Sequence, residues 1–354
     1  MDHVIEEVMS DPKVLRWANR PAHQLTVGVL HPSGRKIWSS GGESGETNGT
    51  GRAYEIGSIT KTMTGLMLAA GEQQALWSRS DRLSDVNLDL AASPFAKQTT
   101  LLDLVTHTSG LPDVPGNFKA SITDRLNPYA NYDEARLIEA VLAEKPKSGS
   151  RHRYSNYGFG LLGWLLSRRL GTTLDDALTR QVFHPLGMPD TYAGGRTPAP
   201  AQLLPVYNSK GKVLPPWDFH EAMGGAGAVR STAADMLNYL EAHVHPDSHS
   251  LSPAVEEGLK EHYAIMPSRG IGIGYGWMRY REKDGTVTHW HNGGTYGSSS
   301  FIAFNRSKGA GVVILSNNGS TMWSQLAPML GLRLLSVDAL ATRLTKKLFA
   351  ASAG

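Results

Sequence analysis

Ser58 and Lys61 are the first side chains whose types and spacing could do chemistry together. On a helix, residues three positions apart are neighbours on the surface, so these side chains would lie side by side. A serine hydroxyl is a poor nucleophile until a base takes its proton, and a lysine becomes such a base when its pKa is lowered. Gly57 places Ser58 at the start of the predicted helix, where free N–H groups favour a developing oxyanion. The pair predicts nucleophilic acyl transfer; the alternative is a helix cap and a surface lysine.

The Ser-x-x-Lys spacing alone is weak, because it also occurs at Ser10–Lys13, Ser33–Lys36 and Ser209–Lys212. The first contains a proline, the second spans a predicted hairpin turn, and the third lies in a glycine-containing loop. Only Ser58 begins a segment with a long apolar face at about 100° per residue, which is typical of a packed helix. The apolar face consists of Ile59, Met63, Leu66, Met67 and Ala70, and the helix is expected to end near Gly71.

Tyr154 and Asn156 form the second candidate pair. A tyrosine beside the serine and lysine can move a proton if an adjacent ammonium lowers its pKa from about 10. The amide of Asn156 can bind a substrate amide or hold Lys61. Tyr129–Asn131 has the same spacing but lies in a polar loop, whereas Tyr154 stands between a turn and an apolar helix. The alternative for Tyr154 is a core tyrosine with a satisfied hydroxyl.

The third candidate is the run His291-Asn292-Gly293-Gly294, on or beside a predicted strand. Glycines in a strand let a ligand or another backbone approach closely, and a strand edge can bind a substrate chain through backbone hydrogen bonds. The N–H of Gly294 would be an oxyanion donor. The alternative for His291 is a surface histidine. His289 would share its strand face, but no third-ligand pattern accompanies the two histidines, so no metal site is predicted.

Strand patterns at the two ends of the chain and helical patterns between them must position these groups. Strands are expected at 24–30, 35–40, 278–281, 286–290, 298–305 and 311–316. Helices are expected at 134–143, 157–170, 174–182, 232–243, 253–265 and from about Met322. A short first helix is also expected, because Val4, Ile5, Val8 and Met9 repeat at helical spacing behind Asp2, a possible N-cap. Residues 41–51 are expected to form a loop.

These patterns predict an α+β fold: one antiparallel sheet built from both ends of the chain, flanked by terminal helices, with a mostly helical domain inserted. The 354 residues are enough for about two domains. We expect residues 1–78 and 276–354 to form the sheet domain and 79–275 the inserted domain.

Composition excludes several classes of function. The net charge of +3, with no run of five basic residues, does not favour nucleic acid binding. The absence of cysteine excludes disulfides, thiol nucleophiles and cysteine-based metal sites. No stretch is long and apolar enough for a membrane span, and the first residues do not resemble a secretory signal, so a cytoplasmic location is expected. Oligomeric state is left open.

The three motifs occur in the order Ser-x-x-Lys, Tyr-x-Asn, His-x-Gly, and with their surroundings they make the sequence resemble the serine β-lactamase/penicillin-recognising superfamily. The resemblance is closest to the class C β-lactamase-like group, which also holds DD-peptidases, D-aminopeptidases and carboxylesterases. It covers about residues 24–320. The supporting stretches are 100–112, 154–163, 185–188, 225–236 and 292–300.

The resemblance implies a β-lactamase/transpeptidase-like fold and a role for each motif residue, with no cofactor. It makes Ser58 the acylated nucleophile, Lys61 and Tyr154 the groups that share proton transfer, the N–H groups of Ser58 and Gly294 the oxyanion hole, and Asn156, His291, Asn292 and Gly293 the substrate-binding residues.

His291 stands where class C β-lactamases carry a lysine. A lysine is a permanent cation that can hold a β-lactam carboxylate, whereas a histidine with a pKa of about 6.5 is mostly neutral at pH 7. The His-x-Gly version is similar to that of DD-peptidases, D-aminopeptidases and many esterases. We therefore expect a serine hydrolase that forms an acyl-enzyme at Ser58 from a small ester, amide or short peptide. Alternatives are a biosynthetic acyltransferase or cyclase, a weak β-lactamase, and a non-catalytic binding homologue.

Loops at 113–131 and 197–222 are expected to border the cleft. Their aromatic residues favour an apolar or aromatic substrate group, or else they close the core of the helical domain. With the residue just past the first loop, they are Phe118, Tyr129, Tyr132, Tyr207, Trp217 and Phe219.

Overall fold

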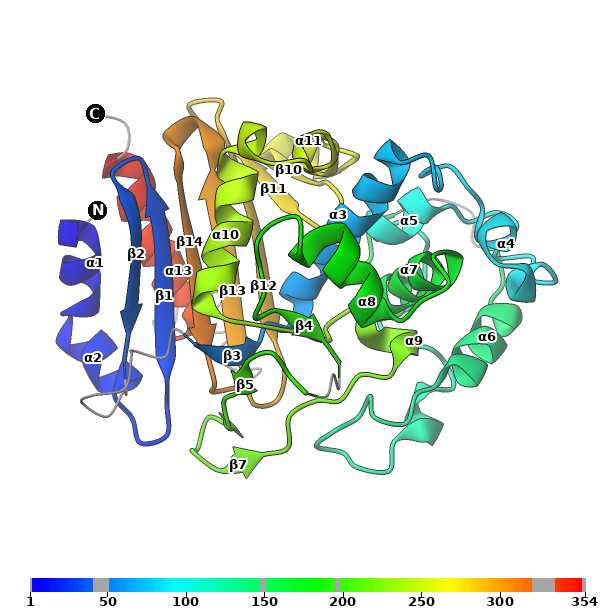
Figure 1. Ribbon diagram of the computed structural model, residues 1–354, viewed down its shortest axis with the longest axis horizontal. Coiled ribbons are helices and arrows are strands. Elements are labelled where there is room, and N and C mark those ends of the chain that lie inside the picture. Colours follow the sequence, from blue (N-terminus) through cyan, green and yellow to red (C-terminus); the bar gives the residue numbers. More distant parts are fainter. Residues whose placement is uncertain (1, 41–50, 147–150, 195–197, 320–334, 352–354) are drawn as a thin grey trace.

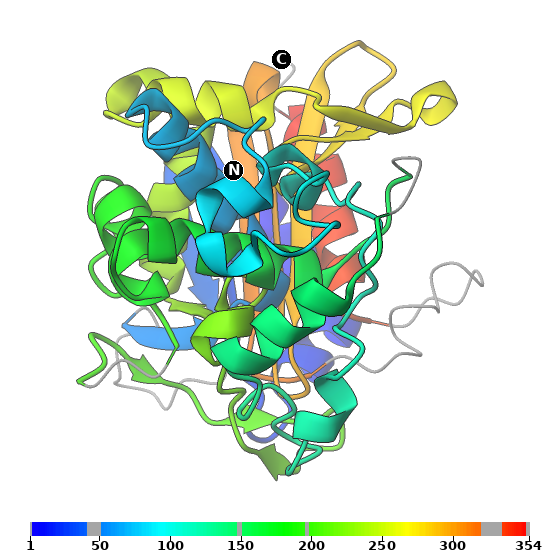
Figure 2. The same cartoon turned by 90° about the vertical axis from the view of Figure 1, so that its right-hand side faces the viewer.

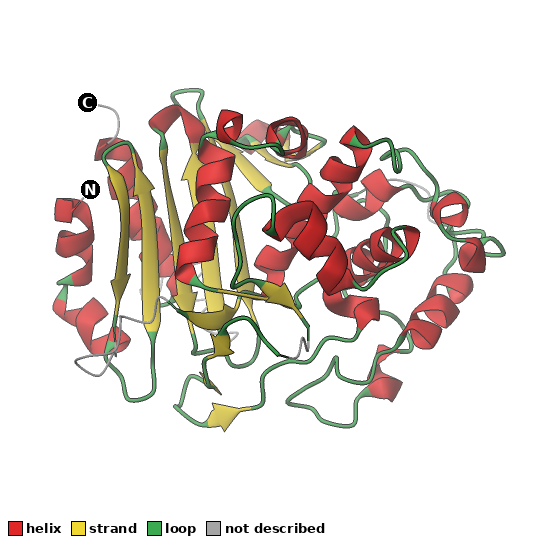
Figure 3. Cartoon of the chain, in the orientation of Figure 1, coloured by secondary structure: helices red, strands yellow, loops and turns green. Residues whose placement is uncertain are grey.

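Strands occupy one half of the molecule and most helices the other (Figures 1 and 3). The structure is a computed structural model, and it describes residues 2–40, 51–146, 151–194, 198–319 and 335–351. The two described ends of the chain lie close together beside the sheet, at the upper left of Figure 1.

The main sheet is antiparallel, has eight strands and follows the order β2-β1-β14-β13-β12-β11-β10-β9. It joins the two ends of the chain, since β1 pairs with β14 with Leu25 opposite Ser316 and Leu30 opposite Gly311. Its strands are β1 (Leu25–His31), β2 (Gly34–Ser39), β9 (Tyr263–Met266), β10 (Ile271–Ile273), β11 (Met278–Arg281), β12 (Val287–Gly294), β13 (Ser299–Asn305) and β14 (Ala310–Ser316).

Both faces of this sheet are covered, which explains why β14 is an unbroken apolar run. Val312 and Ile314 face one apolar cluster, and Val313 and Leu315 face the other. The first face packs against helices from both ends of the chain: α1 (Asp2–Met9), α2 (Pro12–Ala18) and α13 (Val337–Ala351).

The second face is covered by α10 (Ala233–Val244) and by the helical half, which lies in front of the sheet in Figure 2. A short 3₁₀ helix, Gly57–Ile59, leads into α3 (Thr60–Gln73) and abuts β12 and β13. The other helices are α4 (Leu83–Val86), α5 (Leu101–Val105), α6 (Glu134–Ala143), α7 (Asn156–Arg169), α8 (Leu174–Leu178), α9 (Glu221–Gly224) and α11 (Ser252–Leu259).

Short strands lie between the sheet and the helical half. They are β3 (Arg52–Glu55), β4 (Tyr192–Ala193), β5 (Gln202–Leu203) and β8 (Val229–Ser231) in a small sheet, and the pair β6 (Val206–Tyr207) and β7 (Val213–Leu214). The first of these, β3, ends just before the Gly57 turn and so carries the chain into the candidate site.

The architecture is the predicted one, with two corrections to its elements. The helix expected at 253–265 ends at Leu259, because residues 263–266 pair with β10 and extend the main sheet as β9. The strand expected at 286–290 continues to Gly294, because all of its second half pairs with β13. The helix expected from Met322 and nearly all of the loop at 41–51 lie outside the described residues. The division at residues 79 and 276 stays a prediction.

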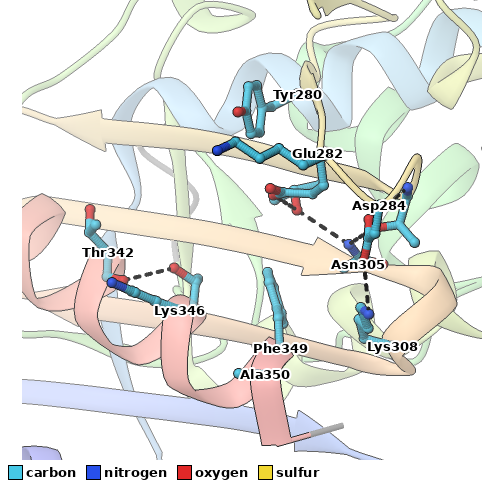
Figure 4. A pocket seen from close by; sticks show the side chains of 13 residues that line it. Tyr280, Glu282, Asp284, Asn305, Lys308, Thr342, Lys346, Phe349 and Ala350 are labelled. Carbon is cyan, nitrogen blue, oxygen red and sulfur yellow. Dashed lines mark hydrogen bonds and ion pairs between the residues drawn. The ribbon is translucent and has the colours of Figure 1, made fainter. Parts of the chain in front are cut away.

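A groove of about 540 Å³ opens on the α13 side of the sheet, between α13 and the hairpin of β11 and β12 (Figure 4). Tyr280 and Phe349 contribute apolar surface, and Asp284 pairs with Lys308 at 3.0 Å. Thr288 lines the groove from β12. Among the described helices, none has the length and apolar content that crossing a membrane requires.

Candidate active site

Gly57 fixes the turn that presents Ser58. Its φ of +50° lies in the left-handed region that favours glycine. A Cβ at this position would lie 2.4 Å from the backbone nitrogen of Gly294, so no other residue fits without moving β12. The sequence therefore brings the Ser58 turn into direct contact with the end of β12.

Lys61 lies one turn into the helical segment and is fully buried. Its Nζ donates hydrogen bonds to Ser58 Oγ at 2.9 Å, to Asn156 Oδ1 at 2.8 Å and to the Ala226 carbonyl at 2.7 Å. Burial lowers the pKa of Lys61 to about 7, although the negative charge of Asp113 acts in the opposite direction. At neutral pH a substantial fraction of this amine is therefore uncharged and able to accept a proton.

Tyr154 approaches Ser58 from the helical half. Its hydroxyl donates a hydrogen bond to Ser58 Oγ at 2.7 Å, and Lys61 Nζ lies 4.9 Å from its ring centre. Tyr154 is 40% exposed. Burial of the rest of the side chain raises the pKa of the phenol above its ordinary value, and the hydrogen bond with Ser58 only partly offsets this. The expectation of a lowered tyrosine pKa is wrong, and the phenol keeps its proton at neutral pH.

Asn156 is positioned at the first turn of α7. Ser155 caps this helix, since its Oγ accepts a hydrogen bond from the Gly158 N–H. The Asn156 amide is oriented from both sides: Oδ1 accepts from Lys61, and Nδ2 donates to Asp113 Oδ1 at 2.8 Å. Sequence reasoning missed Asp113, although it directly follows the stretch 100–112 that supports the family resemblance.

His107, within that same stretch, positions the segment that carries Tyr154. Its φ of +59° is unusual for a residue other than glycine. Its carbonyl accepts from the Arg153 N–H at 2.8 Å, and its Nδ1 accepts from the Ser155 N–H at 3.1 Å. Its ring centre lies 4.7 Å from that of Tyr154. Sequence reasoning missed this role as well, and the positive φ leaves no signal in a single sequence.

The glycines of β12 complete the site. A Cβ on Gly293 would lie 3.0 Å from the backbone nitrogen of Ser58 and 2.1 Å from the Ile56 carbonyl oxygen. Ser300 on β13 holds the same carbonyl with a hydrogen bond of 2.8 Å. The backbone nitrogens of Ser58 and Gly294 thus lie on two segments in direct contact, as an oxyanion hole requires.

His291 and Asn292 point to opposite faces of β12. His291 is buried, and its Nδ1 donates to the Asn292 carbonyl at 2.6 Å. Burial, with the charge of Lys61, lowers the pKa of His291 to about 3, so the ring is neutral. The Asn292 side chain instead donates to Asp338 of α13 at 3.2 Å. The structure therefore brings His291 to the Lys61 side of the sheet and leaves the Asn292 side chain outside the group.

The predicted aromatic residues separate into two sets. Phe118 and Tyr132 are buried in the core of the helical half. Tyr129 instead contacts Trp217, with 5.2 Å between their ring centres. Trp217 in turn contacts Tyr296 edge-on, with 4.8 Å between ring centres. Tyr296, two residues beyond Gly294, is 49% exposed and was not predicted.

Buried Glu55 ties this aromatic pair to the Ser58 turn. Its carboxylate accepts from the backbone N–H of Trp217 at 2.6 Å and from the Thr295 hydroxyl at 2.6 Å. Because Glu55 ends β3 and Thr295 precedes Tyr296, one side chain connects both aromatic residues to the strand before Ser58. The described residues hold no group of three side chains suited to a metal ion.

A family model described as Beta-lactamase matches residues 22–327. The chain belongs to the beta-lactamase family. Among curated relatives, a beta-lactamase of Yersinia enterocolitica is 27% identical over 64% of this chain, and the match spans only 56% of that relative's length. The D-alanyl-D-alanine-carboxypeptidase/endopeptidase AmpH of Escherichia coli K12 is 27% identical over 73% of this chain and 69% of its own.

The structure also resembles solved members of the family. A class C beta lactamase from Rhodobacter sphaeroides superposes with a TM-score of 0.75 at 22% identity, over 99% of this chain and 98% of that chain. This likeness confirms the predicted fold, in which a sheet assembled from both ends of the chain is combined with an inserted helical part.

Proposed function

We propose that this beta-lactamase family member is a serine hydrolase that forms an acyl-enzyme at Ser58 from an ester or amide. The observation that carries the proposal is the double hydrogen bond on one hydroxyl: Ser58 Oγ accepts from Lys61 Nζ at 2.9 Å and from Tyr154 OH at 2.7 Å. A nucleophile in contact with both a base and a proton donor is the arrangement that acyl transfer needs.

Lys61 is the general base of the proposed reaction. In its uncharged form it takes the Ser58 proton as Oγ attacks the carbonyl carbon, and the oxyanion is bound by the N–H groups of Ser58 and Gly294. Tyr154 then gives its proton to the leaving group and regains one from Lys61. Water enters by the reverse route, losing a proton to the same pair and releasing the acid. The pKa of Lys61 near 7 and the raised pKa of Tyr154 support this division of roles.

The substrate we propose is a small ester, amide or short peptide with an apolar group. The pair formed by partly buried Trp217 and exposed Tyr296 supports this, because it offers an aromatic surface connected through Glu55 to the Ser58 turn. Relatives named as carboxypeptidase/endopeptidase and as penicillin-binding protein support the peptide branch. The neutral His291 favours esters and amides over β-lactam carboxylates.

The test is a panel of p-nitrophenyl esters, D-amino-acid amides and a chromogenic cephalosporin, run on the wild type and on Ser58→Ala. We expect hydrolysis of the esters or amides, with phenylacetyl preferred over acetyl esters, and a loss of several powers of ten in Ser58→Ala. Intact mass after a short reaction should show one acyl group, absent from the variant. Ser58→Ala with wild-type rates would refute the proposal, and products formed only with added alcohols or amines would assign the acyltransferase alternative.

A further inference from the structure

Few charged groups contact the hydrogen-bond network around Ser58. Lys61 is fully buried, and its amine donates hydrogen bonds to three protein acceptors. The ring of His291 is neutral. The remaining charged group in hydrogen-bond contact with this network is the carboxylate of Asp113, which is exposed. None of the ion pairs formed among the described residues involves Asp113.

Asp113 is also close to the reaction centre. A continuous chain of hydrogen bonds joins Ser58 Oγ to Lys61 at 2.9 Å, Lys61 to Asn156 at 2.8 Å, and Asn156 to Asp113 at 2.8 Å. Burial is the main cause of the raised pKa of Tyr154 and of Tyr129, and the negative charge of Asp113 raises the pKa of both phenols further. Asp113 therefore lies on the solvent side of the nucleophile, beside the amide expected to face the substrate.

We propose that Asp113 selects substrates by charge: the site accepts esters and amides whose acyl group is uncharged or positively charged, and it disfavours acyl groups that carry a carboxylate. The inference rests on the proposed function and names the substrate class of the same site. The physical reason is that an anionic acyl group would approach a carboxylate that has no ion-pair partner among the described residues. It would also find no free cation among the described groups that contact the Ser58 network. If the substrate charge and the Asp113 carboxylate are assumed to be separated by about 7 Å in a medium of intermediate dielectric, their interaction changes the rate by a factor of about 3 to 10.

Three p-nitrophenyl esters of matched shape test the inference: phenylacetates bearing a 4-methyl, a 4-carboxylate or a 4-trimethylammonium group. The measured quantity is kcat/KM for each, with the wild type, Asp113→Asn and Asp113→Glu. We expect the wild type to prefer the neutral and cationic esters over the anionic one by about tenfold. Asp113→Asn should reduce the cation-to-anion ratio by about 3- to 10-fold, Asp113→Glu should retain it, and added salt should weaken it in the wild type.

The matched control is Asp89→Asn, which removes an exposed carboxylate from the short 3₁₀ helix Leu88–Leu90 and should leave the ratio unchanged. Because the ratio compares substrates on one enzyme, a general loss of activity through a misplaced Asn156 does not affect it. Equal kcat/KM for all three esters would overturn the inference while the proposed function stands. An unchanged cation-to-anion ratio in Asp113→Asn would do the same. Hydrolysis that survives Ser58→Ala overturns the proposed function instead.

Discussion

Lys61 is the residue on which the proposed chemistry depends most. Its amine is enclosed by Ser58, Asn156 and the Ala226 carbonyl, so it must lose solvation to exist as a cation there. A lysine in water would be protonated at neutral pH and useless as a base. Burial thus converts an ordinary side chain into one that titrates where the enzyme works.

The activity of the wild type should therefore depend on pH near neutrality. Only the uncharged amine accepts the Ser58 proton, so kcat/KM should rise with pH through about 7 and level off above it. The measurement is kcat/KM for a p-nitrophenyl ester between pH 5 and pH 9, with the free reaction subtracted. Lys61→Arg, which stays charged throughout, should lose at least about 10³ in rate. A flat profile would contradict the assignment of Lys61 as the base.

Asp113→Asn should move that profile in a defined direction. The groups facing Lys61 are Asp113 and Tyr154 from the helical half and the neutral rings of His107 and His291. Removing the one negative charge removes the influence that raises the lysine pKa, so the rise in kcat/KM should shift to lower pH. Asp113→Glu keeps the negative charge and should therefore show the wild-type dependence of kcat/KM on pH. A shift to higher pH in Asp113→Asn would be inconsistent with this electrostatic account.

The motif residues could be predicted from the sequence because local pattern identifies them: Ser58 and Lys61 share a helix start, and Tyr154 and Asn156 precede an apolar helix. Asp113 and His107 could not, because their roles arise from contacts made across the fold. The Asn292 side chain also could not be placed, since the direction of a β12 side chain depends on register against β13.

The junction between the Gly57 turn and β12 is the element that the oxyanion hole requires. Gly57→Ala would place a methyl group 2.4 Å from the Gly294 nitrogen, at a φ that disfavours a side chain. We expect kcat to fall by about 10² to 10³, because the two N–H donors would separate. The measurement is kcat on the best ester, with thermal unfolding recorded in parallel.

The control for this variant is Gly258→Ala on α11, where the nearest atom to an added Cβ is Tyr275 Cβ at 3.7 Å, an ordinary contact. Removing a glycine from a helix should leave activity intact and stabilise the protein by up to about 1 kcal/mol. Wild-type kcat in Gly57→Ala would show that this junction does not hold the oxyanion.

One face of the main sheet packs an apolar cluster that stabilises the fold, and the other face carries the candidate active site. The cluster under α13 contains side chains from both ends of the chain. Ser58, Lys61 and His291 lie on the other side of the sheet, since Asn292, the strand neighbour of His291, contacts α13 and His291 interacts with Lys61. Leu344, 1% exposed on α13, should therefore matter for folding alone. Leu344→Ala should lower the free energy of unfolding by about 2–5 kcal/mol and leave kcat within twofold of the wild type.

Denaturant unfolding and ester hydrolysis on the same samples check this prediction. The control is Lys347→Ala on the same helix, which breaks an exposed ion pair with Glu7 and should cost no more than about 1 kcal/mol. A large fall in kcat in folded Leu344→Ala would mean that the two faces are coupled.

The overall topology could be predicted because the strand patterns at the two ends are long and apolar and the middle is rich in helical periodicity. The edge strand β9 could not be, since Tyr263–Met266 is short and alternates at only half burial, and pairing with β10 decides its conformation. The same holds for the short strands β4 to β7, which have two residues each.

The pairing of β1 with β14 determines when this protein can mature during synthesis. The hairpin of β1 and β2 leaves the ribosome long before β14, the strand that completes its hydrogen bonds. Until then one edge of the hairpin is an unpaired template for other chains. The sheet must therefore close after translation, through contacts of very high sequence separation that form slowly. A nascent chain stalled before residue 310 should remain sensitive to protease and dependent on chaperones.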